Sequence, residues 1–134
     1  MPKSRLQVIS RKILADLLVF KPEMENAAPV RTKALFDTGA MNSCITSALA
    51  RELESVPTSK ILVAGVHGVK DCNAHTLKIG IPFQSQENKT VIECLDEIEV
   101  FEIDDNPEWN MIVGMDIIQQ GVLVVDGDQC VFSL

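Results

Sequence analysis

The chain has 134 residues and a formal net charge of −7, and 46% of its residues are hydrophobic against 23% charged. This length suits one compact unit, so we expect a single domain over residues 1–134. The hydrophobic fraction excludes a mainly disordered chain. Without a run of 18 uncharged apolar residues, no transmembrane helix is predicted.

Acidic and basic residues are unevenly distributed along the chain. All twelve Lys and Arg residues and eight of the nineteen acidic residues lie within residues 1–89, whereas residues 90–134 hold eleven acidic residues and no basic one. Binding to nucleic acid or to an anionic membrane needs clustered Lys and Arg side chains. Because the basic residues here are scattered, we expect neither a nucleic-acid partner nor a membrane partner.

The chain has four cysteines: Cys44, Cys72, Cys94 and Cys130. A domain of this size does not need disulfides to hold its core, so we expect free thiols in a reducing compartment and, with no evident signal peptide, a cytoplasmic location. His67, Cys72 and His75 lie within nine residues and resemble zinc ligands in type. A fourth ligand at a recognised spacing is missing, so we expect no metal and no cofactor.

Turn-forming residues recur about every ten residues in the first half of the chain, which predicts many short strands. Strands are expected over Ile13–Phe20, with a helix as the weaker alternative, and over Val30–Phe36. A helix is expected over Ser47–Glu54, with Ser47 as its cap. The glycine-bearing segment after Ile61–Val63 is typical of a hairpin tip.

The second half of the chain also predicts strands. Thr76–Ile81 alternates and should end at Pro82, and Thr90–Leu95 and Ile98–Ile103 should form two strands, the second with a bulge after Val100.

The last quarter predicts short elements. We expect a strand over Met111–Val113, one helical turn over Ile117–Gln120, and a hairpin of Val122–Val125 with Asp128–Leu134 around an Asp126-Gly127 turn.

The segment Ala34–Ala40 carries the most informative chemistry. Its sequence Ala-Leu-Phe-Asp-Thr-Gly-Ala places a carboxylate, a small hydroxyl and a glycine directly after an apolar strand. Taken alone, it also fits a strand-ending Asp37 in an ordinary turn.

A second segment, Asn110–Ile118, reads Asn-Met-Ile-Val-Gly-Met-Asp-Ile-Ile and lies about 75 residues downstream of Asp37. Together the two segments resemble the hallmark of the retropepsin-like aspartic proteases, and the C-terminal stretch of Gly114–Ile118, Gly121 and Val131–Ser133 is similar to bacterial members in particular. In that family the second segment packs behind the loop that carries the aspartate, and Val63–Val69 falls where the family has its flap. The resemblance implies a mostly β, single-lobe retropepsin-like (acid protease) fold: a closed β-barrel with one short helix, dimeric.

The sequence departs from the viral pattern at one place. Retroviral proteases usually pair acidic residues after the Asp-Thr-Gly-Ala turn with an Arg after the later glycine. Here Met41 and Asn42 follow the turn and Met115 follows Gly114, so we expect this brace to be replaced by apolar contacts.

Aspartic protease chemistry needs two carboxylates that share a proton and hold a water, and this chain has one Asp-Thr-Gly. The second carboxylate must therefore come from another copy, which predicts a homodimer acting on a peptide or protein substrate. The resemblance gives catalytic roles to Asp37, Thr38 and Gly39. The expected substrate-binding residues are Ala40, Met41, Asn42, Val63, Ala64, Gly65, Val66, His67 and Ile112.

Two other functions remain open from the sequence. The fold is also compatible with a catalytically inactive dimerisation or peptide-binding module, and with a monomeric β-barrel ligand binder in which Asp37 is only a turn residue. Within a dimer, we expect Cys130–Leu134 to pair with the same strand of the second copy, because an apolar C-terminal strand is an exposed edge that needs a partner.

Overall fold

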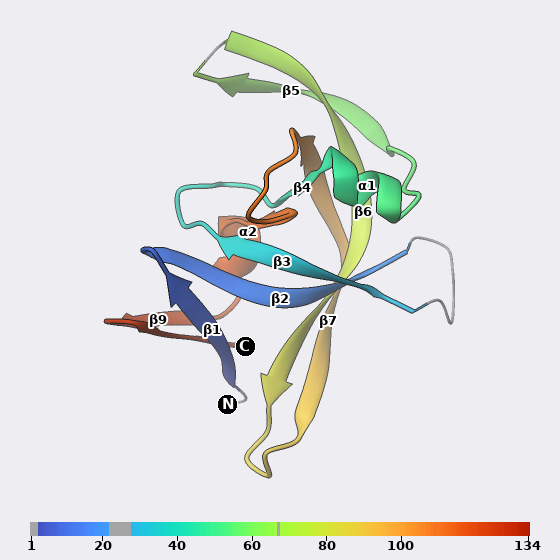
Figure 1. The fold of residues 1–134 in the computed structure, drawn as a ribbon. Coiled ribbons are helices and arrows are strands. Elements are labelled where there is room, and N and C mark those ends of the chain that lie inside the picture. Colours follow the sequence, from blue (N-terminus) through green and yellow to red (C-terminus); the bar gives the residue numbers. More distant parts are fainter. Residues whose placement is uncertain (1–2, 22–27, 67) are drawn as a thin grey trace.

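The computed structural model of the chain describes residues 3–21, 28–66 and 68–134 (Figure 1). The strands are, in chain order, β1 (Lys3–Ile9), β2 (Lys12–Phe20), β3 (Val30–Phe36), β4 (Cys44–Thr46), β5 (Ser59–Gly65), β6 (Gly68–Gln84), β7 (Thr90–Ile103), β8 (Met111–Val113), β9 (Val122–Asp126) and β10 (Gln129–Ser133). The helices are α1 (Ser47–Glu52) and α2 (Met115–Ile118). Within these ranges, neither helix has the length and apolar character needed to cross a membrane.

All the described strands belong to one sheet, whose order of neighbours is β5-β6-β7-β4-β8-β3-β2-β1-β10-β9. The long strand β6 also pairs with β2 and β1, so the pairings from β6 through β7, β4, β8, β3 and β2 return to β6 and close a ring. In Figure 1 the β5–β6 hairpin projects beyond the ring at one end, and the β6–β7 hairpin projects at the other. This mostly β, single-lobe architecture confirms the predicted fold class.

Alternate side chains of the strands face one hydrophobic core, to which both helices and β10 also contribute. Leu17 of β2 and Ile79 and Phe83 of β6 are fully buried. Phe132 of β10 packs edge-on against Phe36 at the end of β3, with ring centroids 5.6 Å apart. This packing fixes the point at which β3 leaves the core, which is where Asp37 follows.

Several predicted boundaries change in the structure, first of all on β6 and β7. The strand continues through Pro82, which pairs with Ile92 of β7 and has no paired residue on its other side, so its missing N–H is tolerated. The two strands expected before and after residue 96 are one strand, β7. Its bulge lies at Asp96 and Glu97, which together oppose Lys78, and not after Val100.

The termini of other elements also differ from the sequence-based expectation. Thr46, not Ser47, caps α1: its Oγ1 accepts from the Leu49 N–H at 3.2 Å. Strand β1 was not predicted, because only Ser4 and Leu6 are buried in it and the residues on either side of them, Lys3, Arg5 and Gln7, are polar. The C-terminal hairpin is confirmed, but its turn lies one residue later than predicted, at Gly127 and Asp128, because Asp126 pairs with Gln129.

Strand β10 is not a free edge, so the expectation that Cys130–Leu134 pairs with a second copy is wrong. The strand lies between β1 and β9 and is hydrogen-bonded on both sides. The sequence shows that the strand is apolar but not which strands flank it. Among the described strands, the two that end the sheet are β5 and β9.

Candidate active site

Asp37 lies in a tight turn that begins where β3 ends. Its backbone N–H donates to the Val113 carbonyl at 2.9 Å, and its carboxylate Oδ1 accepts from the Gly39 N–H at 2.8 Å. The Ala40 N–H returns to the Asp37 carbonyl at 3.2 Å. The carboxylate is thus held by its own turn, with Asp37 half-buried and Thr38 and Gly39 exposed.

Strand β8 runs between the two arms of this turn. It pairs parallel to β3, with Phe36 opposite Val113, and antiparallel to β4, with Cys44 opposite Ile112. The resemblance predicted that the second motif packs behind the aspartate loop, and this placement confirms it. Because β8 is buried at both ends, it holds the turn against the core.

Gly114 lets the chain leave β8 directly beneath the turn. A Cβ at this position would lie 2.8 Å from the carbonyl carbon and oxygen of Asn42 and 2.9 Å from the Ala40 oxygen. These are backbone atoms of the turn itself, so no side chain fits here without moving it. The next residues bind the same loop, since the Met115 N–H donates to the Ala40 carbonyl at 2.8 Å and the Asp116 N–H to the Met41 carbonyl at 3.2 Å.

A polar brace that the sequence analysis did not foresee joins the aspartate turn to the start of α2, beside Met41 and Met115. The Asp116 carboxylate accepts from the Ser43 N–H at 3.0 Å and from the Ser43 hydroxyl at 2.8 Å. The Ser43 Oγ in turn accepts from the Gly114 N–H at 3.0 Å. Ser43 is fully buried and Asp116 is half-buried, so the serine end of the brace is shielded from water. Sequence reasoning missed both residues; the signal was a lone carboxylate within the apolar Gly114–Ile118 segment.

The predicted substrate-binding residues fall into two groups. Ala40, Met41 and Asn42 are in the aspartate turn, where Met41 is 80% exposed, and half-buried Ile112 lies on the adjacent β8. Val63, Ala64, Gly65 and Val66 are at the tip of the β5–β6 hairpin, where Gly65 pairs with Gly68. Val66 is 98% exposed, and His67 lies outside the described residues. Their role in substrate binding stays a prediction.

Cys44, the first residue of β4, lies close enough to Asp37 and Asp116 for their charges to affect its thiol. Burial first, and then the charges of Asp116, Cys72 and Asp37, together raise the pKa of its thiol from the ordinary 9.0 to about 11. Its Sγ lies 3.6 Å from the Asn42 carbonyl oxygen. The four cysteines are free thiols, as expected, and this one is held in its unreactive protonated form.

A second polar cluster lies at the root of the β5–β6 hairpin. His75 is buried, with Nδ1 2.7 Å from the Ser55 Oγ and Nε2 2.8 Å from the Glu102 Oε1. Ser47 donates to the other Glu102 oxygen at 2.9 Å. Burial raises the pKa of Glu102, but hydrogen bonds from His75, Ser47 and Asn73 outweigh this effect and hold that pKa below its ordinary value. Both ring nitrogens of His75 are therefore engaged within the protein, which leaves neither for the zinc site considered from the sequence.

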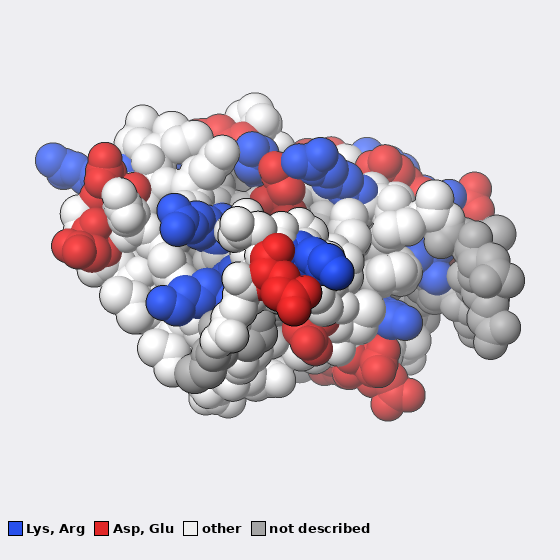
Figure 2. Space-filling model, turned by 90° about the horizontal axis from the view of Figure 1, so that it is seen from below, with Lys and Arg blue, Asp and Glu red and all other residues white. Residues whose placement is uncertain are grey.

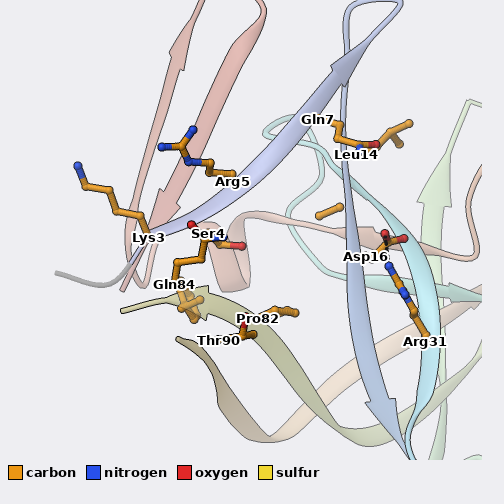
Figure 3. Close-up of a pocket in the computed structure, with 12 residues that line it drawn as sticks. Lys3, Ser4, Arg5, Gln7, Leu14, Asp16, Arg31, Pro82, Gln84 and Thr90 are labelled. Atoms are coloured by element: carbon orange, nitrogen blue, oxygen red, sulfur yellow. Dashed lines mark hydrogen bonds and ion pairs between the residues drawn. The ribbon is translucent and has the colours of Figure 1, made fainter. Parts of the chain in front are cut away.

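An open cavity of about 250 Å³ lies elsewhere, among β1, β2, β3, β6 and β7 (Figure 3). None of the predicted site residues lines it; basic Lys3, Arg5 and Arg31 do, with Asp16 3.0 Å from the Arg31 guanidinium. Figure 2 shows Lys and Arg side chains interspersed with Asp and Glu over the face seen from below. The cavity has one carboxylate, Asp16, which is paired with Arg31, and it lies apart from the Asp37 turn.

Comparisons with known proteins agree with this geometry at the level of the fold. No protein-family model matches the sequence, and no curated protein matches it. A retropepsin-like aspartic protease from Rickettsia conorii aligns with a TM-score of 0.62 at 16% sequence identity, over 97% of this chain and 89% of that chain.

Two viral structures align less closely. The simian foamy virus (mac) protease has a TM-score of 0.49 at 15% identity, over 79% of this chain and 91% of that chain. The EIAV protease, solved with an inhibitor, has a TM-score of 0.43 at 21% identity, over 84% of this chain and 89% of that chain. The Rickettsia alignment spans nearly the whole chain, and with the Asp37 turn threaded by β8 it shows that this chain has the retropepsin-like fold.

Proposed function

We propose that this chain is an aspartic endopeptidase that works as a homodimer. The observation that carries the proposal is the Asp37-Thr38-Gly39 turn, held at the end of β3 by β8 and the Asp116 brace in a retropepsin-like fold. An ordinary surface turn is held by its own residues, whereas this turn is also held by β3, β4, β8 and the buried Ser43. The rigidity of this turn is what a carboxylate needs when it must meet a second carboxylate at a defined distance.

The proposed chemistry follows from two Asp37 side chains facing each other across a two-fold axis. The pair shares one proton, because two like charges at about 3 Å do not both ionise easily. The ionised carboxylate takes a proton from a water as that water attacks the scissile carbonyl carbon. The protonated carboxyl group donates a hydrogen bond to the carbonyl oxygen and stabilises the tetrahedral intermediate.

The neighbouring residues have supporting roles in this proposal. The Thr38 hydroxyl hydrogen-bonds across the axis and fixes the two carboxylates, and the Gly39 carbonyl accepts from the main chain of the substrate. The tip of the β5–β6 hairpin, with its exposed Val66, covers an extended peptide and pairs with it as a strand does. Met41 and Ile112 are the proposed apolar walls, so cleavage between hydrophobic residues is expected.

The test is cleavage of a mixed peptide library from acidic to neutral pH, read by mass spectrometry. Wild type is compared with Asp37→Asn, which is nearly isosteric and removes the proton chemistry. Asp128→Asn, in the exposed C-terminal hairpin turn, is the matched control for the loss of one negative charge. We expect cleavage by wild type and by the control, and none by Asp37→Asn.

A mixing experiment tests the shared dyad. Adding excess Asp37→Asn chain to a fixed amount of wild type should lower activity in proportion to the mixed dimers formed, since each mixed dimer has one functional carboxylate. Cleavage that survives Asp37→Asn would refute the proposed mechanism. A folded dimer that cleaves nothing at any pH would favour the alternative, an inactive dimerisation or peptide-binding module.

A further inference from the structure

Backbone pairing holds the β5–β6 hairpin to the rest of the molecule only at its root. Among the described strands, β5 pairs with β6 alone. Strand β6 pairs with β5 up to Ala74 and with β7 from Ala74 onward, so the residues before Ala74 project beyond the ring (Figure 1). An arm attached at one end is oriented by the contacts at that end. The side chains next to Ala74 therefore decide where the hairpin tip lies.

One buried histidine joins both legs of the hairpin at this root. His75 follows Ala74 on β6 and is 1% exposed, and its Nδ1 lies 2.7 Å from the Oγ of Ser55, which precedes β5 in the chain. Its Nε2 lies 2.8 Å from the Oε1 of Glu102 on β7, and the other Glu102 oxygen accepts from Ser47 at 2.9 Å. We call Ser47, Ser55, His75 and Glu102 the His75 network. It fastens the two legs of the hairpin to β7 and to the start of α1.

Two further side-chain contacts near the hairpin lie at the surface. Lys70 is 3.6 Å from Asp104, but these side chains are 70% and 92% exposed, and an exposed ion pair fixes geometry weakly. The hydroxyls of Thr58 and Thr76 lie 3.3 Å apart, also at an exposed position. The His75 network is buried at its centre, where hydrogen bonds to a carboxylate are stronger. It is therefore the firmest of these side-chain attachments.

The His75 network is fastened to the same strands as the aspartate turn. Glu102 pairs with Ile45 of β4. One residue earlier on β7, Phe101 donates its N–H to the Ser43 carbonyl at 3.1 Å. Ser43 belongs to the brace that holds the turn, so β4 and β7 connect the root of the hairpin with the turn.

The hairpin and the aspartate turn also lie close together in space. After burial and Asp116, the charges of Cys72, on the hairpin part of β6, and of Asp37 raise the pKa of the Cys44 thiol. The effect of a charge falls with distance, so both residues lie near Cys44. A change in the angle of the hairpin at its root would therefore alter the space beside Asp37.

A buried polar network is a costly way to hold a fold, since apolar side chains of similar volume often stabilise it as well. Hydrogen bonds add direction, because they weaken steeply when their angle changes. We propose that His75 is a positioning residue for substrate binding: the His75 network clamps both legs of the hairpin and sets the position of its tip relative to Asp37. The inference deepens the proposed function and rests on it, because the hairpin tip is the proposed cover of the substrate.

The first experiment measures motion of the hairpin by NMR relaxation dispersion on the full chain. The test variant is Glu102→Ala, and the matched control is Glu99→Ala, which removes an exposed carboxylate from the same strand. In the test variant, the exchange contribution at backbone amides of β5 should rise at least about threefold, because hinge motions occur on the microsecond to millisecond timescale. Amides of β2 and β3, and all amides of the control, should stay as in wild type.

The second experiment measures peptide cleavage by the same proteins and by two milder variants. Glu102→Ala should raise KM about fivefold or more and leave kcat within about twofold, because the Asp37 turn is intact once substrate is bound. Ser55→Ala removes one bond of the network and Glu102→Gln keeps an acceptor for His75, so both should have smaller effects in the same direction. A merely structural role would lower the amount of active enzyme, which reduces the apparent kcat and leaves KM unchanged. Far-UV circular dichroism confirms that each variant is folded before it is compared.

The outcomes separate this inference from the proposed function. Greater motion of the hairpin together with a higher KM in the network variants, and neither in the control, supports the positioning role. Unchanged hairpin motion in folded Glu102→Ala and Ser55→Ala overturns it and leaves the protease proposal standing, as does greater motion with an unchanged KM. A wild type that cleaves nothing overturns the substrate role together with the proposed function, and the relaxation data then decide separately whether the network clamps the hairpin.

Discussion

The brace between Ser43 and Asp116 should hold the aspartate turn in place, so its removal should cost both stability and activity. Asp116→Ala removes two hydrogen bonds from Ser43, at 3.0 and 2.8 Å, and one from the Ile117 N–H at 3.0 Å. A hydrogen bond to a charged group contributes about 1.5–3 kcal/mol, so the two bonds to buried Ser43 together predict a loss of about 3–6 kcal/mol. That is a large fraction of the roughly 5–15 kcal/mol that stabilises a typical domain.

Two further variants divide this brace into its parts. Asp116→Asn keeps one acceptor oxygen but turns an NH₂ group toward a donor, so about half of the loss is expected. Ser43→Ala removes one bond and leaves the buried Gly114 N–H without its acceptor, at a cost of about 2 kcal/mol. In a double-mutant cycle, Ser43→Ala and Asp116→Ala should couple by about 1–2 kcal/mol, because they share the hydroxyl–carboxylate bond.

The assay is urea unfolding of each variant, followed by peptide cleavage at a temperature where all of them are folded. Asp128→Ala is the control, because this carboxylate lies in an exposed turn and a change of no more than about 0.5 kcal/mol is expected. Cleavage by Asp116→Asn should fall further than its folded fraction, since the turn is displaced. An Asp116→Ala variant whose free energy of unfolding matches that of the control would refute the reasoning.

Two more predictions test the surroundings of the site. Gly114→Ala should abolish cleavage and lower the thermal midpoint markedly, because its Cβ would lie 2.8 Å from the Asn42 backbone. Gly127→Ala meets no atom within 4 Å but is strained by the φ of +60° at that position, so it should lower the midpoint less and leave cleavage intact. Equal cleavage by both variants would contradict the close packing. Glu102→Gln should remove stability that depends on pH: the folded pKa of Glu102 lies below its ordinary 4.5, so its ionised form stabilises the fold above that pH and the benefit disappears as pH falls through the folded pKa. Urea titrations at several pH values should show the gap between wild type and variant narrowing toward acid, and a constant gap would contradict this assignment.

The sequence by itself determined the elements whose evidence is local. An apolar strand followed directly by Asp37-Thr38-Gly39 predicted the aspartate turn, and a later apolar triplet followed by Gly114 predicted a short strand. That this strand packs behind the turn was implied by the resemblance to the retropepsin-like proteases. Alternation and turn residues predicted β2, β3 and the C-terminal hairpin, because these signals depend on neighbours in the chain.

Only the tertiary structure decided which residues meet across the chain. Ser43 and Asp116 are 73 positions apart, and no sequence pattern around either residue predicts their contact. His75, Ser55 and Glu102 come from three separate segments, and the sequence has no pattern that predicts the hydrogen bonds that join them.

The neighbours of the terminal strands were also decided by the tertiary structure. An apolar C-terminal strand was expected to be free, yet β1 and β9 flank β10 on both sides. The physical reason is that periodicity specifies which face of a strand is buried, whereas the strand that covers its edge is chosen by the closure of the whole sheet.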